Sequence, residues 1–205
     1  MTARPVESLQ TRSAVRRAQI LDAALACFIR QGVEATAIED ICSRCGASVS
    51  SVYHLFGNKA GIVAALYLDS LAAFQSCVCK QLEPAVGARE GVHAFVAAHI
   101  RWAEKNRERA SFLQAARHTS GVAALEQDIH ALNQAFFHAI GAWVKAHLAS
   151  GQLRALPTDL FIAQLLGPTH EYVRARLVGR AGAPLKLAIA SLGETAWRAL
   201  GNQDS

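Results

Sequence analysis

The chain has 205 residues, a formal net charge of +5 and a pI of about 9.2. This length can bury one sizeable core or a small domain docked on a larger one, and so modest a positive charge does not by itself identify a nucleic-acid-binding protein. The five cysteines are an odd number spread along the chain, which argues against a secreted disulfide framework.

The N-terminus lacks the apolar core of a secretory signal, and no run approaches the ~20 apolar residues that a membrane helix requires. We therefore expect a cytoplasmic protein without membrane contact. Residues 1–12 contain two arginines and a proline but no apolar pattern, which favours a flexible basic arm; an untethered terminus without a role is the alternative. A first helix is predicted from about Ser13 to Gln31, with Gly32 as its C-terminal cap.

A second, short helix is predicted to begin at Thr36. Thr36 and Glu39 have the spacing of a capping box, in which each side chain bonds a backbone amide near the other residue. Gly46 ends this helix. Its apolar face consists of Ile38, Ile41, Cys42 and Cys45. Cys42 and Cys45 form a CxxC motif, but no second CxxC or His pair accompanies it, so we interpret both as packing residues and predict no metal site.

A third helix is predicted from its capping residue Ser48 to Phe56. The side chains predicted to point outward are Val49, Ser50, Tyr53 and His54. Small hydroxyl and apolar side chains at the start of such a helix reach base edges or a thymine methyl group, and Tyr and His further along reach phosphates. The two short helices are typical of a helix-turn-helix.

Gly57-Asn58-Lys59 interrupts the helical pattern before a longer helix. Asn58 is suited to cap that helix. Lys59 falls in its first turn, where a positive charge opposes the helix dipole unless an anion is nearby. A DNA phosphate is such an anion, so we expect Lys59 to contact one.

With these features, the segment from about residue 12 to residue 68 resembles the DNA-binding domain of the TetR family of bacterial transcriptional regulators. The matching positions are Thr36, Glu39, Asp40, Ile41, Gly46, Ser48, Tyr53, His54, Phe56 and Lys59. Three positions depart from the usual pattern. Val49 replaces a common basic residue, Ser50-Ser51 a common Gly-Thr pair, and Ala60 a common acidic residue. The change at position 49 removes one possible guanine or phosphate contact.

The resemblance implies an all-α fold, with a helix-turn-helix DNA-binding domain over residues 13–58 and a larger helical domain over residues 59–205 that binds an effector and dimerises. It also implies which residues contact a double-stranded DNA operator. Those expected to face bases are Ser48, Val49, Ser50 and Ser51, and those expected to face phosphates are Thr36, Tyr53, His54 and Lys59.

Beyond Asn58 the pattern remains helical, with Pro and Gly between the segments. The predicted helices cover roughly residues 59–81, 88–105, 107–118, 121–149, 158–179 and 184–200. In the TetR resemblance this region encloses a small-molecule pocket. Its candidate lining residues are His99, Trp102, Phe112, Arg117, His118, Phe136, Phe137, Trp143, His170 and Tyr172. For each of them, a place in the core or on the surface is the alternative.

The last two helices carry apolar stripes, and the corresponding pair joins two TetR-like chains in a four-helix bundle. We therefore expect a homodimer, with intramolecular packing as the alternative explanation of the stripes. Twofold symmetry implies a palindromic operator with half-sites about 34–36 Å apart or a multiple of that distance.

The sequence thus predicts a transcriptional regulator, most simply a repressor that a small-molecule effector releases from its operator. A TetR-like sensor or adaptor without sequence-specific DNA binding is the second interpretation, and the loss of a basic residue at Val49 favours it. An enzyme is not expected, because the sequence has no nucleophile elbow, phosphate loop or metal motif, and no cofactor is predicted.

Overall fold

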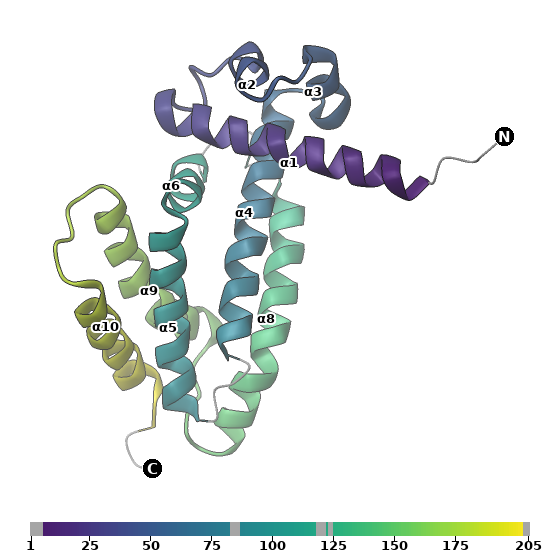
Figure 1. Ribbon diagram of the computed structural model, residues 1–205. Coiled ribbons are helices and arrows are strands. Elements are labelled where there is room, and N and C mark those ends of the chain that lie inside the picture. Colours follow the sequence, from purple (N-terminus) through teal and green to yellow (C-terminus); the bar gives the residue numbers. More distant parts are fainter. Residues whose placement is uncertain (1–5, 83–86, 118–121, 123–124, 203–205) are drawn as a thin grey trace. The chain divides into compact units, whose positions relative to one another are not determined.

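The computed structural model describes residues 6–82, 87–117, 122 and 125–202. Over these residues the chain forms nine α-helices and no β-strand, which confirms the all-α fold (Figure 1). The helices are α1 (Val6–Gln31), α2 (Ile38–Cys45), α3 (Val49–Phe56), α4 (Lys59–Leu82), α5 (Ala88–Lys105), α6 (Arg107–Ala116), α8 (Glu126–Ala149), α9 (Thr158–Leu177) and α10 (Leu185–Leu200). Two compact units result: a first unit of Met1–Ser70 and Ser111–Glu126, and a second unit of Leu71–Ala110 and Gln127–Ser205.

The first helix is longer than the sequence pattern predicts. α1 begins at Val6 rather than near Ser13, so the part of the predicted flexible arm from residue 6 onward is helical, while residues 1–5 lie outside the described residues. Residues 6–12 contain no Pro or Gly that would interrupt a helix. The C-terminal end is as predicted: Gly32 has a φ of +83° and its amide donates to the carbonyl of Phe28 at 2.9 Å.

The core of the first unit is built from one face of each of its helices. Its most deeply buried large side chains include Ile20, Ile41, Val52, Ile62, Leu66 and Phe112. The rings of Phe28 and Phe112 stack with their centroids 5.8 Å apart. Removing a fully buried side chain of this size from water contributes roughly 1.5–3 kcal/mol to stability, so these contacts fix the platform that carries α2 and α3.

Helix α4 corrects one expectation. By length and composition alone its 24 residues could cross a membrane, whereas no apolar run of that length is expected from the sequence. Within the protein, however, α4 supplies core side chains such as Ile62, Leu66 and Val78. The core helix of a soluble protein satisfies the same length and composition test, so this one helix is weak support for a membrane span.

The second unit is organised around α5, which packs against α9 and α10 (Figure 1). Along α5 most side chains from Val92 to Ala103 are buried. Helix α8 also approaches α5 closely, because a Cβ atom added at Gly91 would lie 2.1 Å from the ring of Trp143. Most boundaries agree with the predicted ones within two residues. Besides α1, the exception is α8, which begins at Glu126 rather than near residue 121.

Candidate nucleic-acid interface

Helices α2 and α3 form a helix-turn-helix in the first unit. Gly46 ends α2 with a φ of +65°, a backbone conformation that glycine adopts without a steric penalty. Ser48 has extended backbone angles and its Oγ accepts a hydrogen bond from the amide of Ser51 at 3.2 Å. The predicted N-cap of α3 is therefore confirmed, and this cap sets where the helix starts.

The exposure of α3 side chains confirms the predicted outer face. Val52 is fully buried, whereas Val49 is 38% and Tyr53 51% exposed. Ser50 and His54 are also exposed. Val49, Ser50, Tyr53 and His54 are thus available to a partner of this helix.

The serine hydroxyls at the start of α3 bond to one another. Ser48 Oγ lies 3.0 Å from Ser50 Oγ and 2.8 Å from Ser51 Oγ, in addition to its bond from the Ser51 amide. This network stabilises the first turn of the helix. It also means that each hydroxyl already has a partner within the protein.

Thr36 does not have the role that the sequence pattern indicates. Helix α2 begins at Ile38 with Ala37 as its N-cap, and Asp40, not Glu39, reaches back to accept from the Ala37 amide at 3.0 Å. Thr36 is buried, and its hydroxyl donates to the carbonyl of Gly32 at 2.7 Å. The predicted capping role is therefore wrong, and the buried hydroxyl is not presented to a phosphate.

Asp40 stabilises the start of α2 through one carboxylate oxygen. This oxygen accepts from the Ala37 amide and from the side-chain amide of Gln31 at 2.9 Å. The bond from Ala37, followed by that from Gln31, lowers the pKa of Asp40 below its ordinary value. The carboxylate therefore stays ionised in the capping position at neutral pH.

Lys59 corrects a second prediction. Its ammonium group donates to three backbone carbonyls, of Val33 at 3.0 Å, Glu34 at 2.9 Å and Thr36 at 3.0 Å. A lysine has three donors, so the whole group is used within the protein. Lys59 ties the turn between α1 and α2 to the first turn of α4, which makes it a positioning residue rather than a phosphate ligand in this structure.

The junction between α3 and α4 is tightly packed. Asn58 caps α4 as predicted, because its Oδ1 accepts from the amide of Gly61 at 2.8 Å. A Cβ atom added at Gly61 would lie 1.9 Å from the carbonyl oxygen of Phe56. Only glycine fits where the end of α3 meets the start of α4, and this contact fixes the orientation of α3.

Two arginines, one beside and one within the helix-turn-helix, are not among the predicted DNA contacts. The guanidinium of Arg17, on α1, lies 5.7 Å from the ring centroid of Phe56 at the end of α3. Arg44 is exposed in the last turn of α2. Arginine is too common in the sequence to be assigned a DNA contact from residue type alone. The proximity of Arg17 to α3 is evident only in the folded chain.

Residues 20–66 match the family model described as bacterial regulatory proteins, tetR family. This segment contains most of α1, all of α2 and α3, and the start of α4. Over this segment the chain is therefore similar to the N-terminal region of tetR-family regulatory proteins, and the match contains the complete helix-turn-helix. Comparison with curated proteins finds no match.

Solved structures share the fold along nearly the whole chain. A TetR family transcription regulator from Marinobacter aquaeolei VT8 is 18% identical, with a TM-score of 0.80 over 95% of this chain and 100% of that one. PfmR from Thermus thermophilus is 24% identical, with a TM-score of 0.70 over 87% and 97%. FadR from Bacillus subtilis, in complex with stearoyl-CoA, is 19% identical, with a TM-score of 0.75 over 87% and 96%. At these identities the likeness establishes the fold.

Among the residues predicted to line an effector pocket, the structure brings three together in the second unit. The His99 ring lies 4.7 Å from that of His170 and 4.8 Å from that of Phe74, which also packs against Trp102 at 5.3 Å. His99 is buried and its Nδ1 has no hydrogen-bond partner. Burial, and next the nearby His170, lower the pKa of His99 to about 3, so its ring is neutral at physiological pH.

Three further candidates are elsewhere. Phe112 belongs to the core of the first unit, where it stacks on Phe28. Arg117 is exposed in the same unit. His118 lies outside the described residues. The helical spacing of apolar residues around these positions does not indicate that α6 belongs to the first unit from Ser111 onward.

The candidates on α8 differ in exposure. Phe136 is buried and Phe137 is 40% exposed, with their rings 5.6 Å apart. Trp143 is half-buried beside His147, and its indole N–H is buried without a hydrogen-bond partner. Trp143 therefore offers an unused donor, whereas Phe136 behaves as a core residue.

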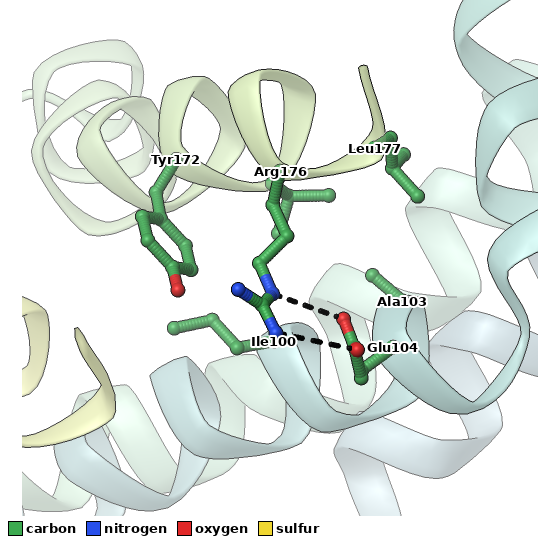
Figure 2. Close-up of a pocket in the computed structure, with 7 residues that line it drawn as sticks. Ile100, Ala103, Glu104, Tyr172, Arg176 and Leu177 are labelled. Atoms are coloured by element: carbon green, nitrogen blue, oxygen red, sulfur yellow. Dashed lines mark hydrogen bonds and ion pairs between the residues drawn. The ribbon is translucent and has the colours of Figure 1, made fainter. Parts of the chain in front are cut away.

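Tyr172 lies at a small pocket between α5 and α9 (Figure 2). In Figure 2 Tyr172 and Arg176 project from α9, and Arg176 bonds Glu104 of α5, with Arg176 Nε 3.2 Å from Glu104 Oε2. Arg176 lowers the pKa of Glu104 through this hydrogen bond. The pocket offers about 10 Å³, the space of one water molecule. It is far smaller than the ~300–1,000 Å³ typical of a small-molecule site.

Proposed function

We propose that this protein is a TetR-type homodimeric repressor that binds a palindromic DNA operator and is released by a small-molecule effector. The observation that carries the proposal is the exposed face of α3, held by caps at both ends of the turn and by the close contact at Gly61. A recognition helix needs such a fixed and exposed N-terminal half to reach base edges in the major groove.

The DNA contacts that we propose follow from exposure. Ser48, Val49, Ser50 and Ser51 lie at the start of α3, where base edges would be within reach. Tyr53 and His54 are exposed further along, and two exposed arginines of the same unit, Arg17 over the Phe56 ring and Arg44 in the last turn of α2, supply positive charge. These last four side chains are the proposed phosphate contacts. Thr36 and Lys59 are no longer included, because their polar groups are engaged within the protein.

The proposed dimer uses outward-facing apolar side chains of the last two helices. Leu160 and Val178, at the two ends of α9, are 47% and 59% exposed, and Leu187 on α10 is 60% exposed. Exposed large apolar side chains on both of these helices are consistent with a partner that covers them. A twofold dimer would present two copies of α3 to the two halves of a palindrome.

The proposed effector site is the aromatic cluster of the second unit, with His99, Trp102 and His170 as contacts. Its lining suits a mainly apolar molecule with a hydrogen-bonding group, because the cluster combines rings with the buried, unpartnered Nδ1 of His99. Trp143, beside Gly91 and His147, is a separate candidate donor in the same unit. A fatty acyl-CoA is a ligand of one relative in the same fold, and it belongs among the first compounds to test.

The decisive experiment selects bound fragments from random DNA with purified protein at about physiological salt, after light scattering has established the oligomeric state. A dimeric protein that recovers a palindrome supports the proposal, and the recovered operator then serves to screen effectors that release it. A folded dimer that recovers no preferred sequence would overturn it. That result would favour the second function, a sensor or adaptor without sequence-specific DNA binding, for which the absence of Lys and Arg from α3 is the supporting observation.

A further inference from the structure

The recognition helix α3 has an unusual surface for a DNA contact. Its eight residues, VSSVYHLF, include no Lys, Arg, Asn, Gln, Asp or Glu. These are the residue types that recognise guanine, adenine or cytosine through hydrogen bonds in the major groove. Hydrogen-bonded readout by α3 is therefore left to Ser, Tyr and His side chains.

The serines are poorly placed to take over that readout. The Oγ atoms of Ser48, Ser50 and Ser51 form one network at the N-terminus of α3, with separations of 2.8 and 3.0 Å. Ser48 also accepts from the Ser51 amide. A base edge would have to compete with these existing hydrogen bonds for the same hydroxyl groups.

Val49 and Tyr53 are the two large hydrophobic side chains that α3 exposes. They are four residues apart, so they lie on one face of the helix. They are 38% and 51% exposed, while Val52 between them is fully buried. Together they form an exposed apolar contact surface at the part of the helix that leads into the groove.

Among the groups that base pairs present in the major groove, one is apolar: the C5-methyl group of thymine. We propose that Val49 and the ring of Tyr53 recognise thymine through this methyl group, while the Tyr53 hydroxyl at the end of the ring reaches a phosphate, and that methyl contacts account for much of the sequence preference of α3. The proposal rests on the proposed function, in which α3 enters the major groove of an operator.

Replacing thymine with deoxyuridine in the selected operator tests the proposal with the unaltered protein. The substitution removes one methyl group and keeps the Watson–Crick pairing. Each thymine is replaced in turn, symmetrically in both half-sites. At one or two positions per half-site we expect the affinity to fall about fourfold for each methyl group lost, or roughly 15-fold for the symmetric pair, by the value of a buried methylene group.

A variant of the protein then assigns the contact to a residue. Val49→Ala should bind the thymine operator more weakly than the unaltered protein, and its affinity should no longer change when the sensitive thymine becomes deoxyuridine. Ser50→Ala, at the neighbouring exposed position, serves as the matched control and should retain the full methyl effect. Tyr53→Ala is measured in the same way at the second sensitive position.

Two outcomes would overturn the proposal and can be told apart. Specific binding of a palindrome that tolerates deoxyuridine at every position would refute methyl recognition alone. Equal methyl effects in the Val49→Ala variant, the Tyr53→Ala variant and the unaltered protein would do the same. If the protein selects no sequence at all, the proposed function and methyl recognition fail together.

Discussion

Inside each of the two units, the hydrogen bonds and ion pairs join residues at very different separations along the sequence. In the helix-turn-helix, Asp40 bonds Ala37, Ser48 bonds Ser51 and Asn58 bonds Gly61, each across three residues. The second unit depends on pairs far apart in sequence. Its long-range pairs include Gln75–Asn133, Arg89–Glu194 and Glu104–Arg176. The local caps therefore set where the short helices of the first unit begin, whereas the shape of the second unit depends more on long-range pairs.

The units also differ in how completely their polar groups are satisfied. Every donor of Lys59 has a carbonyl partner in the first unit. In the second unit His99 Nδ1 and Trp143 Nε1 are buried without one. A buried polar atom without a partner costs roughly 1–3 kcal/mol. A ligand that supplied the missing partner would recover that cost, which is why this difference favours the second unit as the place where an effector acts.

The largest effect is expected from Gly61→Ala, which tests whether the first unit depends on the close contact between α3 and α4. The new Cβ atom would meet the Phe56 carbonyl oxygen at 1.9 Å, and backbone cannot move aside as a flexible side chain can. Overpacking of this kind costs about 3 kcal/mol. Urea unfolding should show that loss together with loss of operator binding.

Gly141→Ala is the matched control, because it lies inside α8 with open space where the Cβ would be placed. There alanine should be neutral or stabilise by up to about 1 kcal/mol through its helix propensity. A Gly61→Ala protein as stable as the unaltered one would show that the α3–α4 junction is not rigid.

The next largest effect concerns the second unit, with its unpartnered buried His99, and is seen in the pH dependence of stability. The pKa of His99 is lowered to about 3 in the folded chain, against about 6.5 when unfolded. Below pH 6.5 the unfolded state therefore takes up a proton that the folded state does not, so stability falls as the pH falls toward 3. From this group alone we expect a loss of about 2 kcal/mol between pH 7 and pH 5.

Urea midpoints at these two pH values provide the measurement. His99→Phe keeps a ring of similar size and removes the titrating group, so the variant should lose less stability on acidification than the unaltered protein by about that amount. If both proteins respond to pH equally, His99 is not buried in its neutral form.

The separation of interacting residues along the sequence also explains what the sequence could predict. Ser48, Gly46 and Asn58 act on residues within four positions, so their patterns predicted the helix-turn-helix and its exposed face. The buried Thr36 and the three bonds of Lys59 could not be anticipated, because Lys59 meets carbonyls 23 to 26 positions earlier.

The effector candidates show this limit more strongly. Periodicity places His99 and His170 on helices, but nothing in it shows that their rings meet. Phe112 has the same helical spacing as its neighbours and yet belongs to the first unit. Residue type and period define which face of a helix is apolar, whereas the partner of that face depends on the whole fold.

Lys59→Met should have a smaller effect on stability. It tests whether the turn before α2 depends on the hydrogen bonds that Lys59 of α4 donates to it. Methionine keeps much of the length of the side chain and removes the charged donor. The three carbonyls of Val33, Glu34 and Thr36 would then turn to water. Because the lysine is only half-buried, we expect a loss of about 1.5 kcal/mol, with operator affinity falling in parallel.

The salt dependence of binding separates this role from a phosphate contact. A positioning role leaves the slope of log affinity against log salt unchanged, whereas loss of one phosphate contact reduces it by about 1. Arg44→Met, which removes an exposed charge at the end of α2, is the comparison variant. For Arg44→Met the slope of log affinity against log salt should decrease and the free energy of unfolding should not change. A decreased slope in Lys59→Met, with a loss of stability in Arg44→Met, would contradict the structure.

The smallest effect is expected from Ser48→Ala, which removes a single local cap. The variant loses the bond from the Ser51 amide and the centre of the serine network, at a cost of about 1 kcal/mol. Ser43→Ala is the control, because that hydroxyl donates to the Glu39 carbonyl within α2 and caps nothing. If local caps position α3, operator affinity should fall in Ser48→Ala and not in Ser43→Ala. Equal affinities in the two variants would mean that the junction at Gly61 alone is sufficient to hold the recognition helix.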